Sequence, residues 1–279
     1  MDIITSKSND NVKFIKGLND KKERIKNNCY YLEGIKVITE VLESDKAIDV
    51  KFIAFSSNIL SKVNGGKEIL QKLENLDSIK KIEFSPEVFE YITDTKTPQG
   101  ILAVMNIVEK SYEEILDKGE NILLLDKVQD PGNIGTIIRT CDAFNVQNII
   151  YLNGTGDIYS PKTVRSTMGS MLRVSFVKIT EEELEKLKNK AINTGYEIIG
   201  TSLQTNNYVE NIKFSNNKNI IIFSNEANGI SDNVKDICTR LVKINMADTA
   251  ESLNVGIAAG IILHKMYSDN IWVSFVKFN

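Results

Sequence analysis

The stretch NILLLDKVQDPGNIGTIIRTCDAFNV, residues 121–146, decides the fold of this chain. Its apolar start at 122–125 predicts a buried strand, the residues DPGN favour a turn, and apolar side chains recur at helical spacing from Ile134. We expect Asn133 to cap this helix and Arg139 to lie on its surface, outside the apolar stripe. A helix start after a strand is where α/β proteins place ligands, so the stretch is either a ligand site or an ordinary capped helix.

Downstream, the same alternation of apolar strands and helices continues. Such strands, separated by helices, indicate a parallel sheet that is covered on both faces. The glycines of NGTG (153–156) do not complete a Rossmann fingerprint, so we expect a loop there. We assign no structure to the apolar tail 268–279. The expected strands are 121–126, 148–152, 173–179, 196–202, 219–224 and 240–245, and the expected helices lie near 134–144, 161–170, 181–193, 231–238 and 254–267.

Upstream, helices and strands alternate over a shorter span, which predicts a small α/β domain at 1–105 ahead of a larger domain at 106–279. Ser85 followed by Pro86 is typical of a helix start. The polar segment TDTKTPQG (93–100) interrupts the pattern. The elements expected here are helices within 1–28, at 35–42, at 67–76 and from 86, and strands at 29–34, 50–56, 79–84 and 101–108.

The composition is that of a globular protein, with 279 residues, 42% hydrophobic and 25% charged. No apolar run reaches the ~20 residues of a membrane span, and the first ten residues are too polar for a secretory signal peptide. Cys29, Cys141 and Cys238 are odd in number and widely spaced, which indicates neither a disulfide framework nor a zinc site. We therefore expect a cytoplasmic protein without a metal and without membrane association.

The chain has a single histidine, His264, which limits the catalytic mechanisms and metal sites that it can use. Triads with a catalytic histidine and histidine-rich metal sites would all depend on it, and its place in a helical pattern indicates a surface or packing role. Catalysis must then rely on Arg, Glu, Asn, Ser and backbone groups, or on a cofactor that supplies its own reactivity.

The net charge of −3 and the pI near 5.5 do not indicate nucleic-acid binding, but the charge is unevenly distributed. Residues 7–26 contain seven basic and three acidic side chains, a local excess of +4. This segment is either a surface that binds the phosphates along a nucleic-acid backbone or a solvated helix face.

Two later stretches place polar residues after buried strands. In NIIIFSNEANGIS (219–231), the carboxylate of Glu226 follows the strand, a place that suits a ligand crevice or a solvated turn. In VKINMADTAESLNVGIAAGIILHKM (242–266), Ser252 or Asn254 is expected to cap a helix rich in small residues. Small residues allow a ligand or another backbone to come close, although a tight packing contact would use them equally.

Together these three stretches resemble the SpoU, or TrmH-type, RNA ribose 2′-O-methyltransferases. The resemblance covers almost the whole chain except the tail. VRSTMGSMLRV (164–174) lies between the first two motifs, and YLEG (31–34) and TKTPQG (95–100) resemble the N-terminal domain of ribosomal-RNA members. The motifs are Asn133, Gly135 and Arg139 as N-x-G-x-x-x-R, Glu226 and Gly229 after a strand, and Ser252-Leu253-Asn254-Val255 before an alanine-rich helix.

The resemblance implies an α/β protein whose C-terminal parallel-sheet domain (106–279) contains a deep trefoil knot, formed by loops 224–230 and 246–254. It also implies that this domain binds S-adenosylmethionine, that the active unit is a homodimer and that the partner is RNA. Residues 1–105 would form an L30e-like domain that binds the RNA substrate. Knots are so rare that sequence periodicity alone would argue against one.

The resemblance implies roles for individual residues as well. Arg139 corresponds to the catalytic arginine, assisted by Asn133, Glu226, Ser252 and Asn254. Because an arginine stays protonated in proteins and is a poor base, we expect it to grip a phosphate and stabilise a developing alkoxide. The residues implied to bind S-adenosylmethionine are Leu203, Ser224, Asn225, Glu226, Gly229, Ile244, Met246, Ser252 and Leu253.

Some positions depart from the family pattern. Ser224 and Ala227 stand where many relatives carry glycine, which bears on S-adenosylmethionine affinity, while Asn245 replaces a common proline and Gly256 a common serine or alanine. The expected activity is methyl transfer to a ribose 2′-hydroxyl of 23S ribosomal RNA, because the N-terminal domain and the basic segment 7–26 favour that substrate. The alternatives are a transfer-RNA methyltransferase and a non-catalytic RNA-binding protein on the same scaffold.

Overall fold

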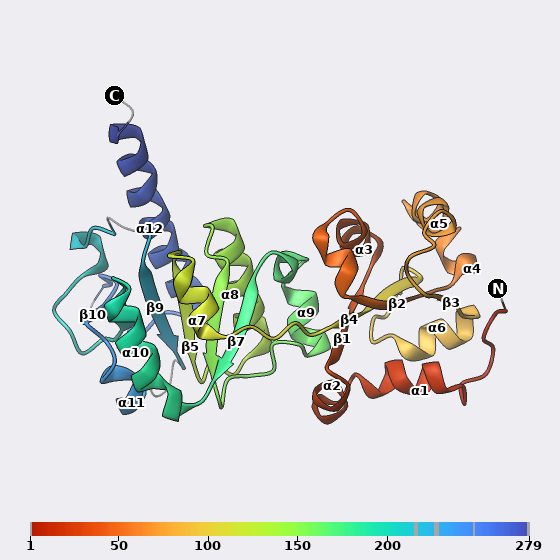
Figure 1. Ribbon diagram of the computed structural model, residues 1–279, viewed down its shortest axis with the longest axis horizontal. Coiled ribbons are helices and arrows are strands. Elements are labelled where there is room, and N and C mark those ends of the chain that lie inside the picture. Colours follow the sequence, from red (N-terminus) through yellow and green to blue (C-terminus); the bar gives the residue numbers. More distant parts are fainter. Residues whose placement is uncertain (1, 215–216, 226–228, 248, 278–279) are drawn as a thin grey trace. The chain divides into compact units, whose positions relative to one another are not determined.

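The computed structural model divides the chain into two compact units, each with its own sheet (Figure 1). Among the described residues, no helix is long and apolar enough to cross a lipid bilayer. Unit 1 is Met1–Val108 with Tyr159–Leu172, and unit 2 is Glu109–Ile158 with Arg173–Asn279. The structure describes residues 2–214, 217–225, 229–247 and 249–277, with side chains as far as Asn270.

Unit 1 is built on a mixed sheet with the strand order β1-β4-β2-β3, in which β2 and β3 pair in parallel and the other pairs are antiparallel. Val12, Ile15 and Leu18, which are spaced for one helix face, are all fully buried. Ser85 caps the helix that begins at Pro86, as predicted. The strands are β1 (Cys29–Glu33), β2 (Val50–Phe55), β3 (Lys81–Glu83) and β4 (Ile101–Asn106), and the helices are α1 (Asp10–Gly17), α2 (Lys21–Asn27), α3 (Ile35–Leu42), α4 (Ser57–Leu60), α5 (Gly66–Glu74), α6 (Pro86–Ile92) and α9 (Pro161–Ser166), with 3₁₀ segments η1 (Asp45–Asp49) and η2 (Ser170–Leu172).

The segment Tyr159–Leu172 joins unit 1, although in sequence it lies between two strands of unit 2. Helix α9 contacts β1, and the ring of Tyr159 lies 5.0 Å from that of Tyr30. The helix predicted at 161–170 ends earlier, because Met168 and Gly169 have φ angles of 52° and 93°, which a right-handed helix cannot contain.

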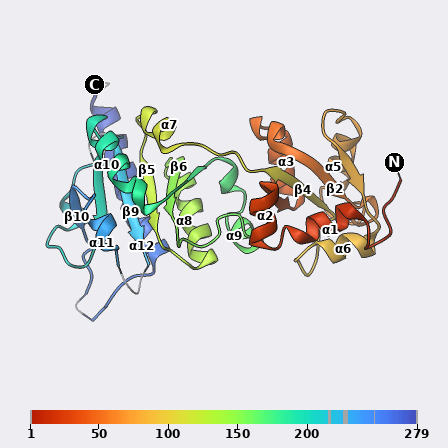
Figure 2. The same cartoon turned by 60° about the horizontal axis from the view of Figure 1, so that its bottom comes forward.

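Within the described residues, unit 2 contains a sheet of six parallel strands in the order β10-β8-β9-β5-β6-β7, so the predicted parallel sheet is confirmed. Helices α7, α10 and α11 share a core with one face, whereas α8 and α12 contact each other on the opposite face (Figures 1 and 2). The strands are β5 (Ile122–Asp126), β6 (Asn148–Leu152), β7 (Ser175–Ile179), β8 (Glu197–Thr201), β9 (Asn219–Ser224) and β10 (Arg240–Val242), and the helices are α7 (Tyr112–Asp117), α8 (Pro131–Ala143), α10 (Leu184–Asn193), α11 (Asp232–Lys235) and α12 (Val255–Lys277), with 3₁₀ segments η3 (Glu181–Glu183) and η4 (Val209–Asn211).

Two predicted boundaries near the end of the chain differ from the structure. The strand expected at 240–245 ends at Val242, because the backbone N–H of Lys243 donates to the carbonyl of Asn207 in a loop. The final helix, expected at 254–267, runs on to Lys277, so the apolar tail continues α12.

The direction in which the chain adds strands to this sheet reverses between β5 and β9. Strand β5 leads through α8 to β6 on one side, whereas β9 leads through α11 to β10 on the other. The connections therefore diverge where the two strands end, at the paired residues Asp126 and Ser224. Open α/β sheets bind ligands in the crevice that such a divergence leaves at the carboxyl ends of the strands.

Candidate functional site

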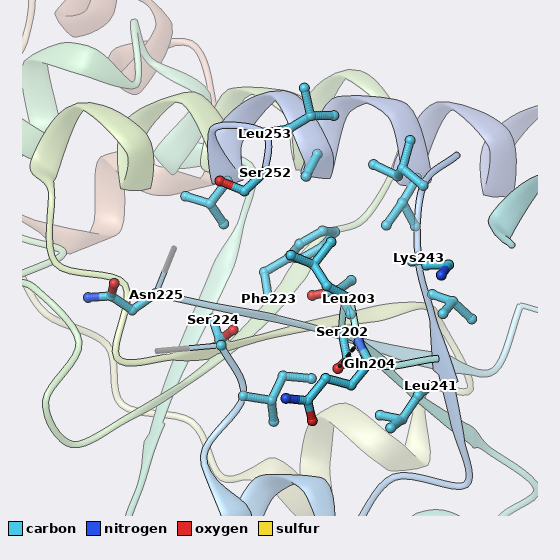
Figure 3. Close-up of a pocket in the computed structure, with 18 of the residues that line it drawn as sticks. Ser202, Leu203, Gln204, Phe223, Ser224, Asn225, Leu241, Lys243, Ser252 and Leu253 are labelled. Atoms are coloured by element: carbon cyan, nitrogen blue, oxygen red, sulfur yellow. Dashed lines mark hydrogen bonds between the residues drawn. The ribbon is translucent and has the colours of Figure 1, made fainter. Parts of the chain in front are cut away.

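A cavity of about 400 Å³ lies at the carboxyl ends of β8, β9 and β10, beside the start of α12. This volume falls within the roughly 300–1,000 Å³ of small-molecule sites. Figure 3 shows that its labelled residues come from separate segments, with Ser202 and Gln204 after β8, Ser224 at the end of β9, and Ser252 before α12. One ligand in the cavity would therefore touch segments that are distant in sequence.

The cavity combines an apolar wall with polar groups at its rim. Phe223, Val242 and Ile262 are buried and supply the wall. Hydroxyl and amide groups of Ser202 and Gln204 stand at the rim, where the Gln204 N–H donates to the Ser202 hydroxyl at 3.2 Å. This arrangement suits a flat ring system that packs on apolar side chains and forms hydrogen bonds at its edges.

The residues predicted to bind the cofactor meet at this cavity, although they come from four parts of the sequence. Glu226, and Ala227 beside it, lie outside the described residues. The other predicted residues all line the cavity, namely Leu203, Ser224, Asn225, Gly229, Ile244, Met246, Ser252 and Leu253.

Sequence reasoning missed several residues of the same cavity. Thr201, Ser202 and Gln204 lie beside the predicted Leu203 at the end of β8, and Lys243 follows β10. Position is the signal that identifies them, because residues directly after any strand of a parallel sheet reach the same edge.

Asn133 does not cap α8, so that prediction is wrong. The N-cap is Asp130, whose Oδ1 accepts from the backbone N–H of Asn133 at 2.9 Å. Pro131 occupies the first helical position, which proline favours because it has no N–H to leave unpaired there. The helix consequently begins before Ile134, and Asn133 lies in its first turn.

The side chain of Asn133 contacts a residue far along the chain. Nδ2 of Asn254 donates to Oδ1 of Asn133 at 2.9 Å across a separation of 121 positions. Oδ1 of Asn254 accepts from the backbone N–H groups of Gly256 at 3.0 Å and Ile257 at 3.4 Å, so Asn254 caps α12. Of the two residues expected to cap this helix, Asn254 does so, whereas Ser252 lines the cavity.

Helices α8 and α12 approach closely beside this pair of asparagines. A Cβ atom on Gly256 would lie 3.0 Å from Cγ2 of Thr136 and 3.2 Å from Oδ1 of Asn254. Glycine thus lets the start of α12 reach α8, and a serine or alanine at this position would require Thr136 to move.

Arg139 is exposed on α8, as predicted, and forms no hydrogen bond or ion pair with any described residue. It follows Asn133 by six residues, which corresponds to a rise of about 9 Å along the helix. Its exposed guanidinium group is available to bind an anion.

Other reactive side chains are poorly placed for catalysis. His264 is exposed, and its ring meets that of Phe144 edge-on at 5.5 Å, in agreement with a packing role. Burial raises the pKa of Cys238 to about 11 and also raises the pKa of Cys141, so both thiols stay protonated near neutral pH. In the described ranges, no group of three or more His, Cys, Asp or Glu side chains is arranged to hold a metal ion.

Comparisons with known proteins find relatives of both parts of the chain. The sequence model of the SpoU rRNA Methylase family matches residues 120–264, and that of the MRM3-like substrate binding domain matches residues 9–103. The 23S rRNA (guanosine(2553)-2'-O)-methyltransferase RlmP of Bacillus subtilis is 31% identical over 94% of this chain and 98% of its own. The AdoMet-bound rRNA methyltransferase of Sinorhizobium meliloti is 26% identical, with a TM-score of 0.82 over 96% of this chain and 97% of its own. AviRb of Streptomyces viridochromogenes, in complex with AdoMet, shares the fold at 23% identity and a TM-score of 0.79, over 95% of this chain and all of its own.

Proposed function

We propose that this chain, which belongs to the SpoU rRNA methylase family and is an S-adenosylmethionine-dependent RNA 2′-O-methyltransferase, methylates 23S ribosomal RNA. The relative from Bacillus subtilis acts on that RNA, and a substrate-binding domain model matches the N-terminal part of this chain. The observation that carries the proposed methyl-transfer site is the hydrogen bond between Asn133 and Asn254, which brings the first and third motifs together.

The cavity at the carboxyl ends of β8, β9 and β10 is the proposed S-adenosylmethionine site. Its buried wall offers an apolar surface to the adenine ring, and Leu203, Ile244 and Leu253 line it. Backbone groups after β9 and β10 would form hydrogen bonds with the edge of the ring. Glu226 belongs to the proposed site on the strength of its motif.

Bound S-adenosylmethionine supplies a methyl group that is already activated as a sulfonium. The chain's own residues must therefore orient the ribose and control the charge on its 2′-oxygen. In our proposal, Arg139 binds the neighbouring phosphate and stabilises the developing alkoxide. Asn133, Ser252, Asn254 and Glu226 position that arginine and the ribose.

Residues 1–105 are the proposed RNA substrate-binding domain, with an L30e-like fold. Helices α1 and α6 lie side by side (Figures 1 and 2), and Nζ of Lys7 and Nζ of Lys16 lie 4.7 Å and 5.1 Å from the ring centroid of Tyr91. Tyr91 is 42% exposed, so its ring can stack on a base while the two ammonium groups contact phosphates. We therefore assign the basic segment 7–26 to phosphate binding.

We further propose that loops 224–230 and 246–254 form a deep trefoil knot and that two copies associate as a homodimer in the cytoplasm. Ile257, Ile261 and Tyr267 are exposed on α12, and a second copy would cover this apolar surface. The three cysteines are free thiols, which suits a reducing compartment.

Two measurements test this function. Calorimetry of the purified protein with S-adenosylmethionine should show binding, and the absence of binding would reject the proposed cofactor site. Ribose methylation should then be mapped across ribosomal and transfer RNA from cells with and without the protein. We expect one methylated position of 23S ribosomal RNA to be lost, whereas loss of a transfer-RNA position would contradict the proposed substrate.

A further inference from the structure

We propose that Asp126 is a positioning residue for cofactor binding, because it holds both ends of the loop that follows β9, residues 225–231. The inference rests on the proposed S-adenosylmethionine site, since Asn225, Gly229 and Ile230 of this loop line that cavity. Asp126 itself does not line that cavity, so its effect on the cofactor passes through the loop.

Asp126 accepts a hydrogen bond from each end of the loop. It ends β5 and pairs in register with Ser224, which ends β9. The backbone carbonyl of Asp126 accepts from the N–H of Asn225 at 3.3 Å, where the loop leaves the sheet. Its Oδ2 accepts from the N–H of Ser231 at 2.8 Å, where the loop returns ahead of α11.

A carboxylate is an unfavourable choice here if stability of the fold is its only purpose. Asp126 is 1% exposed, and its Oδ1 has no hydrogen-bond partner within the described part of the chain. A buried charge with so few partners destabilises the folded state, which a neutral side chain would avoid. A charged oxygen, however, binds an N–H more strongly than a neutral one does. The carboxylate therefore binds the loop more strongly than a neutral side chain would, but it lowers the stability of the folded state.

The loop also has open space on its other side. A second cavity, of about 360 Å³, is lined by Asp126 and Ser231, and it shares Asn225 and Gly229 with the first. Apart from its chain neighbours, a Cβ atom on Gly229 would meet no atom of the described residues within 4 Å. Asn225 and Gly229 thus border both cavities, and the hydrogen bonds that Asp126 accepts from Asn225 and Ser231 fix the two ends of the loop.

The same two strands carry a matched polar contact at their opposite ends. Oδ1 of Asn121, directly before β5, accepts from the backbone N–H of Asn219 at 3.2 Å and from its Nδ2 at 2.8 Å. Asn121 is buried like Asp126 and joins the same strands, but it does not touch the loop. Its substitution therefore reports the effect of losing such a contact on the fold alone.

The test compares full-length Asp126→Ala, Asp126→Asn and Asn121→Ala by calorimetry with S-adenosylmethionine and by thermal unfolding. Asp126→Ala should raise the Kd for S-adenosylmethionine about tenfold or more, because a charge-assisted hydrogen bond to the loop is lost. Asp126→Asn should raise the Kd by a smaller factor, about threefold, since its amide oxygen can still accept from Ser231 but without the charge. Asn121→Ala should lower the melting temperature but leave the Kd within about twofold.

A second variant keeps the test decisive if Asp126→Ala does not fold. Ser231→Pro removes the N–H that Asp126 binds, and the φ angle of Ser231, −65°, already suits proline. This variant should also raise the Kd about tenfold, and it should raise KM for S-adenosylmethionine more than it lowers kcat.

Three results would overturn the inference. The first is an unchanged Kd in Asp126→Ala and Ser231→Pro, which would show that the contact does not position the loop. The second is an equal rise in Asn121→Ala, which would show a general effect of instability. The third is failure of the wild-type protein to bind S-adenosylmethionine, which would reject the cofactor site itself and this inference with it.

Discussion

The two ends of the central strands β5 and β9 use their polar side chains differently. At the amino ends, Asn121 and Asn219 satisfy each other through two hydrogen bonds. At the carboxyl ends, Asp126 lies opposite Ser224 and keeps one carboxylate oxygen without a partner among the described residues. Both ends are buried. The amino ends thus satisfy their polar groups within the sheet, whereas the carboxyl ends border cavities.

The winding of the sheet explains this difference. At the amino ends, the hydroxyl of Tyr196 donates to the carbonyls of Leu116 and Glu120, at 3.2 Å and 3.0 Å. These hydrogen bonds link the residue before β8 to α7 and to the segment between α7 and β5. At the carboxyl ends, the connections diverge to opposite faces and leave a crevice. Substitutions at the amino ends should therefore change the free energy of unfolding, and substitutions beyond the carboxyl ends should change methyl transfer.

The largest effect is expected at Arg139, on the helix that leaves the carboxyl end of β5. Arg139→Ala should slow methyl transfer about 10²–10³-fold, because a group that stabilises developing charge is lost. The melting temperature should barely change, since the side chain is exposed. Single-turnover methylation of ribosomal RNA measures the rate. A fully active Arg139→Lys variant with a new ionisation typical of lysine in its pH–rate profile would contradict our assignment and favour a base.

A smaller effect at Asn254 separates the helix cap from the contact with Asn133. Asn254→Ser keeps an oxygen that can cap α12 but loses the donor to Asn133, so methyl transfer should slow about tenfold with little change in stability. Asn254→Ala should slow it equally and also lower the free energy of unfolding by about 1 kcal/mol. Rate assays and urea unfolding measure the two quantities. Wild-type rates in Asn254→Ser would show that the contact is dispensable for catalysis.

A more modest effect, confined to RNA affinity, is expected in unit 1. Tyr91→Ala should weaken binding of ribosomal RNA about fivefold, because a stacking surface is lost. Replacing Lys7 and Lys16 by alanine should weaken binding and reduce its salt dependence. Filter binding at two salt concentrations measures both, and Lys67→Ala, at an exposed position of α5, is the control. S-adenosylmethionine affinity should not change, and a change would mean that unit 1 acts on the cavity.

The smallest effect on methyl transfer is expected at the amino ends, where Tyr196→Phe should lower the free energy of unfolding by about 1 kcal/mol and leave the rate unchanged. Burial raises the pKa of Tyr196 to about 12, above its ordinary value of about 10. Since the folded state disfavours ionisation, the wild type should lose this stability as pH rises from about 10 through 12. Thermal unfolding of both proteins against pH measures the loss, and parallel curves would refute it.

Strands could be predicted from the sequence better than the ends of helices could. Strands β5 and β9 are short apolar runs, ILLLD and NIIIFS, which periodicity detects directly. Helix ends depend on single residues. Asp130 and Pro131 start α8 ahead of the predicted cap Asn133, and the positive φ of Met168 stops α9 early.

Contacts between distant residues could not be predicted, because they exist only when helices pack. Asn133 and Asn254 each looked like a helix cap, and nothing in either stretch shows that their amides meet. The assignment of Tyr159–Leu172 to unit 1 likewise depends on packing against β1. Asp126 escaped notice because an acid at the end of an apolar run looks like a strand terminator. Its bond to Ser231 forms only in the folded chain.

The Asn133–Asn254 contact sets an order of events during protein synthesis. Asn254 lies directly before α12, which follows every strand of both sheets in the sequence. Since a chain emerges from the ribosome amino end first and its domains fold as they appear, unit 1 and most of the large sheet can form while α12 is still being made. The nascent chain then has its scaffold without the Asn133–Asn254 contact. In the proposed mechanism, methyl transfer to RNA therefore begins only after translation has passed α12.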